Sequence, residues 1–220
     1  MHPGVLENSI VRLEPLAEGH VAPLLAAACV DRSTYDLAVV PGDEASMRAY
    51  VEQAIEECES KRSVPYAVRQ LATGAIVGST RLMNLEWWSW PIGRPVPAGE
   101  PRRKDAGHAP DVAEIGHVWL GKSAQRTPVN TAASLLLMTH AFEEWKLHRL
   151  FLKTDARNDR SRTMILRLGA SFEGTLRAHM PSADGRIRDT AMFSIVPTEW
   201  SRVKARLESM LRAPAHGALP

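Results

Sequence analysis

The sequence has few of the features that mark membrane, exported or metal-binding proteins. Its longest apolar run, residues 21–30, contains a proline and is too short to span a bilayer, and the opening MHPGVLENSI lacks a basic segment followed by an apolar one. The only two cysteines, Cys29 and Cys58, fall in helical patterns, so we expect reduced core thiols. No group of histidines, cysteines or carboxylates has metal-ligand spacing. These absences predict a soluble, cytoplasmic protein with no metal and no membrane partner.

Charge is nearly balanced over the whole chain but is divided between its halves. The formal net charge is +2. Residues 1–100 hold eight Lys and Arg against thirteen Asp and Glu, whereas residues 101–220 hold nineteen against twelve. An acidic first half and a basic second half suit the binding of a small polyanionic ligand by the second half. Because no stripe of basic and aromatic residues occurs, we expect no nucleic-acid partner.

The pattern of apolar residues predicts a single domain of mixed strands and helices over residues 1–220. Strands are expected at 9–16, 64–71, 75–85, 112–120, 149–154, 170–177 and 188–196, and helices at 18–30, 43–60, 129–147, 159–168 and 198–211. Asp43 should cap the second helix, and Gly169 should end the fourth. The strand, helix and strand from 112 to 154 should form a right-handed parallel crossover, with hairpins on either side.

A long segment at about 86–111 interrupts this pattern. It carries three tryptophans (Trp87, Trp88 and Trp90), five prolines and four basic residues. Structureless loops of this length in a compact domain are usually functional or disordered. One interpretation is an aromatic lid beside a binding site; the other is a mobile insertion or a contact between the subunits of a homodimer.

The stretch from Glu114 to Trp145 is a strand, a polar turn and a long helix that starts at Thr127-Pro128. The first backbone N–H groups of a helix have no partner within it, and with the helix dipole they favour an anion. We therefore expect the turn to hold the pyrophosphate of a coenzyme. The alternative is a plain Thr-Pro helix start, since proline suits the first helical position.

Several motifs together resemble the GNAT superfamily, and within it the RimJ/RimL-type ribosomal-protein N-terminal acetyltransferases. They are EIGHVWL at 114–120, QRTPVNT at 125–131, HAFE at 140–143, the Asn158-x-x-Ser161 pair and LGASFEGTLR at 168–177. The resemblance implies an α/β (α+β) GNAT fold: a mixed, mostly antiparallel sheet of about seven strands flanked by helices, with one parallel crossover and a splayed central strand pair. It also implies an N-acyltransferase that passes acetyl from acetyl-CoA to a primary amine, on a protein N-terminus or a small molecule, by direct attack in a ternary complex.

The resemblance also assigns residues to the coenzyme. These are Val118, Trp119, Leu120, Gln125, Arg126, Thr127, Val129, Asn130, Thr131 and Asn158. The family's phosphate turn has the pattern Gln/Arg-x-x-Gly-x-Gly/Ala, from which this chain departs with Pro128 and Asn130. Because proline has no N–H, the donors must come from the flanking positions.

For the chemistry, the resemblance implies that Ser161 protonates the departing thiolate; the alternative is that Asn158 and Ser161 only start a helix. Glu114 and His179 are the candidate bases. Glu114 could instead form a salt bridge, and Met180 stands where similar proteins carry a glutamate base. Strand alternation puts His117 on the face opposite Glu114, in a structural role. The alternative to an enzyme is a non-catalytic module that binds acyl-CoA.

Overall fold

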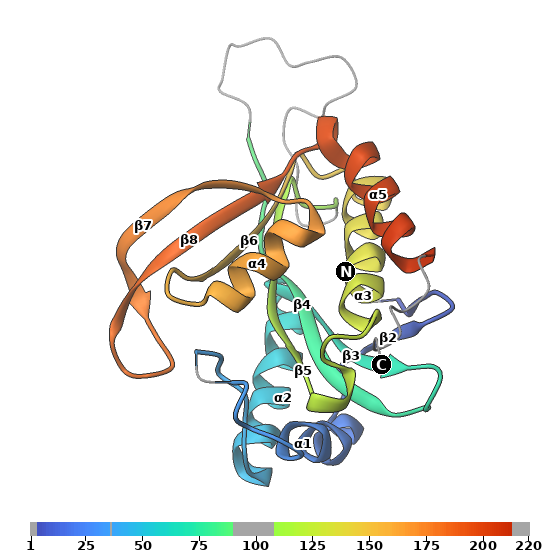
Figure 1. The fold of residues 1–220 in the computed structure, drawn as a ribbon, viewed down its shortest axis with the longest axis vertical. Helices are drawn as coiled ribbons and strands as arrows, with labels where there is room; N and C mark the ends of the chain where they lie inside the picture. Colours follow the sequence, from blue (N-terminus) through green and yellow to red (C-terminus); the bar gives the residue numbers. More distant parts are fainter. Residues whose placement is uncertain (1–3, 36, 90–107, 213–220) are drawn as a thin grey trace, which may run out of the picture.

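The computed structural model describes residues 4–35, 37–89 and 108–212, which form one eight-stranded sheet flanked by helices (Figure 1). The strands are β1 Leu6–Glu7, β2 Val11–Pro15, β3 Ser63–Gln70, β4 Ile76–Glu86, β5 Val112–Leu120, β6 Arg149–Asp155, β7 Ser171–Pro181 and β8 Ile187–Ile195. The helices are α1 Val21–Cys29, α2 Glu44–Glu59, α3 Val129–Thr139, α4 Asp159–Leu168 and α5 Pro197–Arg212. Short helical turns precede α1 (η1 Glu18–His20) and α3 (η2 Lys122–Ala124), and a π-helical turn extends α3 (η3 His140–Glu144).

The sheet has the mixed topology that the sequence predicts. Its strand order is β1-β2-β3-β4-β5-β6-β8-β7, and β5 with β6 is its one parallel pair. The additional eighth strand is β1, which pairs with β2 through only two residues. The predicted splay is confirmed as well: β5 and β6 pair only from Val112–Arg149 to Glu114–Phe151 and then part.

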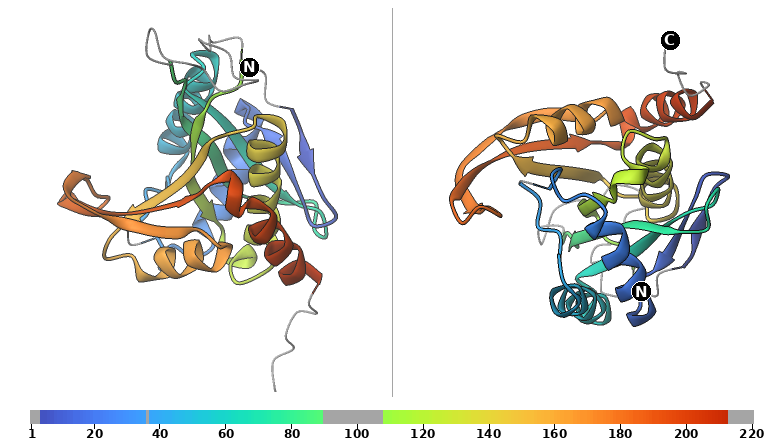
Figure 2. Two further views of the ribbon diagram at one scale, coloured as in Figure 1. Left: turned by 90° about the horizontal axis from the view of Figure 1, so that it is seen from above. Right: turned by 60° about the horizontal axis from the view of Figure 1, so that its bottom comes forward.

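Helices cover the two faces of the sheet unequally (Figure 2). On one face of the sheet, which we call the α3 face, residues of α3, α4 and α5 pack with the strands in one large core. On the other face, which we call the α2 face, α1 and α2 form a smaller core with residues of β3, β4 and β5. Over β6 and β8 the α2 face carries no helix in the described part of the chain, and the long hairpin of β7 and β8 extends beyond it.

One prediction about the central strand is wrong, because β5 contains a β-bulge. Between the pairs Arg81–Gly116 and Ser79–Trp119, β4 advances two residues while β5 advances three. His117 adopts a left-handed backbone (φ +49°) and is the extra residue. Its ring lies 6.0 Å from that of Tyr50 on α2, so His117 faces the same side as Glu114 and not the side of Ile115.

Other local predictions can be compared directly. The Asp43 carboxylate accepts the Ser46 N–H at 2.8 Å and caps α2, and Gly169 ends α4 with φ +101°, both as predicted. Both cysteines are free, but Cys29 is exposed and not part of the core. Most of the predicted insertion, residues 90–107, lies outside the described residues. No helix in the described ranges is long and apolar enough to cross a membrane.

The close approach of β4 to the end of β5 depends on Gly78. A Cβ atom there would lie 2.1 Å from the Trp119 carbonyl oxygen and 2.8 Å from Leu120 Cδ2. We expect Gly78→Ala to lower the free energy of unfolding by ~2 kcal/mol, and the melting temperature by about 4–8 °C. Gly19→Ala is the control, because a Cβ at Gly19 meets nothing within 4 Å. Equal melting temperatures for the two variants would contradict the packing seen here.

Candidate active site

The candidate site begins where the two parallel strands part. The strands run side by side for three residue pairs, after which six residues of β5 and four of β6 continue without pairing to each other. The chain then enters α3 after β5 and α4 after β6. Two helix N-termini therefore follow the open ends of the strands, which is where α/β proteins usually bind ligands.

The turn before α3 presents unused backbone donors. The N–H groups of Arg126, Thr127, Asn130 and Thr131 have no hydrogen-bond acceptor within the described residues. The Val129 N–H is directed to the Thr127 hydroxyl at 3.3 Å. Pro128 immediately precedes the helix, with φ −62°. Four free donors at a helix N-terminus form a concentrated site for an anion.

Gln125 fixes this turn to its surroundings with its side-chain amide. Its Nε2 donates to the Leu120 carbonyl at 2.8 Å and to Thr34 Oγ1 at 2.9 Å, while its Oε1 accepts from Arg160 at 2.6 Å. The Leu120 carbonyl also accepts the Tyr35 hydroxyl at 3.0 Å. One side chain thus joins the end of β5, the loop before α2 and the start of α4.

The start of α4 brings Asn158 and Ser161 to the open end of β6. The Asn158 Oδ1 accepts the Ser161 N–H at 3.0 Å, so Asn158 caps the helix. Its amide nitrogen has no partner among the described residues. The half-buried Ser161 hydroxyl also makes no hydrogen bond within the described chain. Asn158 therefore caps α4, but the Ser161 hydroxyl and the Asn158 amide nitrogen remain available to a ligand.

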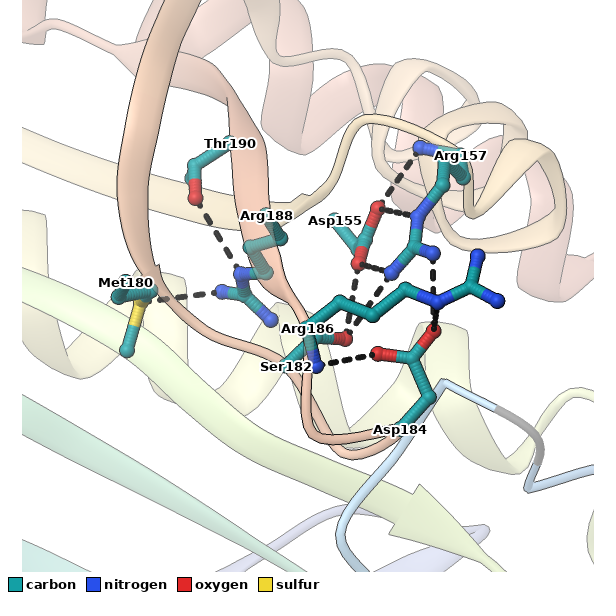
Figure 3. Close-up of polar contacts among 8 residues, drawn as sticks. All are labelled: Asp155, Arg157, Met180, Ser182, Asp184, Arg186, Arg188 and Thr190. Atoms are coloured by element: carbon teal, nitrogen blue, oxygen red, sulfur yellow. Dashed lines mark hydrogen bonds and ion pairs between the residues drawn. The ribbon is translucent and has the colours of Figure 1, made fainter.

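An ion-pair cluster around the buried Asp155 holds the segment just before α4 against the tip of the β7–β8 hairpin (Figure 3). Arg157 donates to Asp155 at 2.6 Å and to Asp184 at 2.8 Å, and Ser182 donates to Asp155 at 3.0 Å. Asp155 is 1% exposed, and the hydrogen bond from Arg157 holds the pKa of its carboxyl well below the ordinary value. The cluster fixes the hairpin tip relative to the segment that leads into α4, although the two lie 27 positions apart in the chain.

A pocket of about 400 Å³ opens on the uncovered part of the α2 face. Its lining residues are Asn84, Leu85, Glu86, Phe151, Lys153, Leu176, His179 and Met192. Glu114 lies behind this wall, 3% exposed, where its Oε2 accepts from Asn84 at 2.6 Å and pairs with Lys153 at 2.9 Å. The lining of the pocket therefore combines apolar side chains with charged ones.

The sequence-predicted residues fall into two groups. The residues at the turn, Asn158 and Ser161 gather at the open ends of β5 and β6, and Val118, Trp119 and Leu120 lie on β5 beyond its last pair with β6. His179 lies on β7 at the pocket, while Glu114 is behind the pocket wall. Sequence reasoning missed Asn84 and Lys153, because nothing local signals that either contacts Glu114.

His117 lies between these groups, in the unpaired part of β5. Its side chain reaches solvent, yet desolvation by the surrounding protein atoms, and next the charge of Arg81, lowers the pKa of its imidazole to about 4. The charge of Lys153 acts in the same direction. His117 is therefore neutral at pH 7. The side chain of His117 lies on the α2 face only because of the β-bulge, and no pattern in the sequence predicts that bulge.

Comparison with known proteins identifies relatives of this fold. A model of the acetyltransferase (GNAT) domain family matches residues 11–171. A Bacillus subtilis protein named "Putative ribosomal N-acetyltransferase YdaF" is 34% identical over 92 residues, which are 42% of this chain and 49% of that protein. The match thus spans about half the length of this curated relative.

Solved structures resemble the whole chain. A GCN5-related N-acetyltransferase from Brucella melitensis is 30% identical, with a TM-score of 0.75, over 96% of this chain and 86% of that one. RimJ of Mycobacterium smegmatis, solved in complex with CoA-disulfide, has a TM-score of 0.71 over 96% of this chain and 98% of its own, at 20% identity. At that identity the likeness concerns the fold alone. The predicted resemblance to the GNAT superfamily is confirmed by the family match.

The buried pair of Glu114 and Lys153 predicts a measurable coupling. We expect Lys153→Met to lower the free energy of unfolding by ~3 kcal/mol, because it leaves a buried carboxylate without its counter-ion. Adding Glu114→Gln should recover more than half of this loss in chemical denaturation. Lys204→Met, which breaks the exposed pair with Glu143, should cost less than about 1 kcal/mol. A loss from Lys153→Met no larger than that of the control would contradict the burial of the pair.

The environment of His117 predicts an unusual titration. In two-dimensional NMR of the histidine rings, one of the eight should titrate near pH 4, and His117→Gln should remove that signal. An unfolded chain takes up this proton near the ordinary pKa of about 6.5. The folded protein should therefore lose stability from this group as pH falls from about 6.5 to 4. A midpoint near 6.5 for His117 would contradict the desolvated position.

Proposed function

Since the chain belongs to the acetyltransferase (GNAT) domain family, we propose that it transfers an acetyl group from acetyl-CoA to a primary amine. The amine attacks the thioester directly, with both substrates bound at once. The observation that carries this proposal is the opening between β5 and β6 beyond the pair Glu114–Phe151, which we call the fork. The turn that follows β5 has four free backbone donors.

The fork and the turn suit the two ends of the donor. In the proposal, backbone groups of Val118, Trp119 and Leu120 pair with the pantetheine arm, because β6 leaves this side of β5 unpaired. The pyrophosphate binds the turn. The residues of the turn that take part are Gln125, Arg126, Thr127, Val129, Asn130 and Thr131. Gln125 contributes by fixing the turn, since its side chain is already bonded on both ends. Asn158 meets the pantetheine amide with its unpaired nitrogen.

The reaction exchanges one bond for another. The amine nitrogen forms a bond to the acetyl carbon, the C–S bond breaks, the nitrogen gives up one proton, and the thiolate takes one. We propose that Ser161 supplies the proton to the thiolate, because its hydroxyl is unbonded in the described chain at the start of α4. An α-amino group with a pKa of about 8 is partly neutral at pH 7, so only a modest base is required.

For that base, the geometry favours His179 over Glu114. His179 lines the pocket and is exposed, so it can contact an acceptor directly. Glu114 is buried and already bonded to Asn84 and Lys153. We propose that Glu114 positions these two side chains at the pocket wall.

We propose the α-amine of a protein N-terminus as the acceptor. One relative carries the name of a ribosomal N-acetyltransferase, although the match covers about half of it. The pocket supports the same choice, because its apolar lining residues Phe151, Leu176 and Met192 can receive the first side chain of a peptide. Glu86 at its rim can attract the positive charge of the free N-terminus.

Binding of the donor is tested by thermal unfolding. Acetyl-CoA at about 100 times its Kd should stabilise the protein by ~2.7 kcal/mol, a rise in melting temperature of about 5–10 °C for a chain of this size. An unchanged melting temperature at millimolar acetyl-CoA would remove the basis of the proposal.

Turnover is tested by release of free thiol with a library of short peptides. Peptides with a free α-amine should release thiol, and the same peptides with a blocked α-amine should not. Ser161→Ala should lower kcat by about 10²-fold, as expected for loss of a general acid. Thr163→Ala, which removes an exposed hydroxyl from the same helix, should be neutral. Binding without thiol release from any amine would instead indicate a non-catalytic acyl-CoA-binding module.

A further inference from the structure

Besides the two proton transfers, amide formation from a thioester needs stabilisation of the thioester carbonyl oxygen. The carbonyl oxygen gains negative charge as the amine attacks, and a hydrogen-bond donor must stabilise that charge. We propose that the imidazole N–H of His117 donates to the thioester carbonyl oxygen. This inference rests on the proposed function and adds a residue to it.

The bulge gives His117 the required place. It lies three residues beyond the last β5–β6 pair at Glu114, within the stretch of β5 that β6 leaves open. Without the extra residue, alternation would direct His117 to the α3 face, where Ile115 packs in the core. The left-handed backbone at His117 directs its side chain instead to the α2 face, beside Tyr50. The same face carries Lys153 and the pocket.

His117 is free to bind a ligand. Neither ring nitrogen makes a hydrogen bond to a described residue, although the side chain is surrounded by polar groups. Two polar groups near it have partners of their own: Arg81 pairs with Glu57 at 3.0 Å, and the Tyr50 hydroxyl donates to Ser79 at 3.1 Å. An exposed ring with one unused N–H, on the stretch of β5 that β6 leaves open, is a donor without an acceptor.

The charges around the ring suit a donor better than a base. Desolvation is the largest cause of the lowered pKa of His117. Arg81 on β4 and Lys153 on β6 lower it further, and Glu57 on α2 raises it to a smaller extent than Arg81 lowers it. Because desolvation and these cations disfavour an added proton, the imidazole stays neutral and keeps one N–H at pH 7. The same cations favour negative charge that develops on a nearby carbonyl oxygen. A neutral histidine can therefore act here as an electrophile.

The step conserves protons at His117. The carbonyl oxygen accepts the N–H hydrogen bond as the C–N bond forms, and the bond is strongest while the oxygen carries its negative charge. When the C–S bond breaks, the carbonyl re-forms and the hydrogen bond weakens. The proton remains on the ring throughout, so the thiolate is protonated elsewhere.

Two variants distinguish a donor from a base. His117→Gly suits the left-handed backbone and removes the ring, so kcat should fall by about 10²-fold, as for other lost oxyanion donors. His117→Gln retains an N–H donor but cannot act as a base, so its kcat should fall by less than about 10-fold relative to wild type. Lys61→Gly is the matched control, because it places glycine at another exposed left-handed residue (φ +59°).

The polarised carbonyl gives a readout that does not depend on turnover. In difference infrared spectra with acetyl-CoA labelled with carbon-13 at the carbonyl, the stretch of the bound thioester should lie at a lower wavenumber than in solution. His117→Gly should return it toward the solution value, while Lys61→Gly should not. Melting curves with and without acetyl-CoA establish that each variant is folded and loaded.

Each result decides between the ideas. Loss of rate and of the infrared shift in His117→Gly, with both largely kept in His117→Gln, supports the donor. An unchanged stretch in His117→Gly, or a glutamine variant as slow as the glycine variant, overturns it while the acetyltransferase proposal stands. If wild type shows neither an acetyl-CoA shift in melting temperature nor thiol release, the proposed function fails, and the role of His117 fails with it.

Discussion

The structure depends most on the separation of two parallel strands after only three paired residues. Strands that part in the middle of a sheet leave backbone donors and acceptors unpaired, and such groups are costly unless something else satisfies them. At the point of parting, the buried ion pair of Glu114 and Lys153 bridges from β5 to β6. Farther along, β5 is not paired with β6, and in the proposed function this edge pairs with the extended arm of the acyl donor. An opening that would weaken an ordinary sheet is thus the feature on which the proposed binding depends.

Long-range polar contacts keep the two halves of the sheet in position around this opening. On the β5 side, Gln125 joins the end of the strand to the loop before α2 and to α4. On the β6 side, Asp155 and Arg157 fasten the hairpin tip to the start of α4. Arg160 of α4 belongs to the first set, and Arg157, just before α4, belongs to the second. Contacts on both sides of the opening therefore hold the start of α4, where Ser161 lies.

Much of the fold followed from the sequence because its signals are local. Helical spacing and the Asp43 cap gave α2, and Gly169 gave the end of α4, since a few neighbouring residues determine each. The two-residue strand β1 was missed because so short a segment has no period. The partners of Glu114 were missed for another reason: Asn84 and Lys153 lie 30 and 39 positions away in the chain, and no local pattern reports such contacts.

The β-bulge also reverses the parity of the central strand. Before it, odd-numbered residues such as Ile115 belong to the large core under α3, whereas after it the even-numbered Leu120 packs there. Trp119, which would otherwise face that core, joins the smaller one beneath α1 and α2. A single added residue lets one continuous strand serve both hydrophobic cores in the right phase at each end. Deletion of one residue from this strand would therefore move the side chains that follow the bulge to the opposite faces of the sheet. The segment EIGHVWL is thus constrained in its length as well as in its residue types.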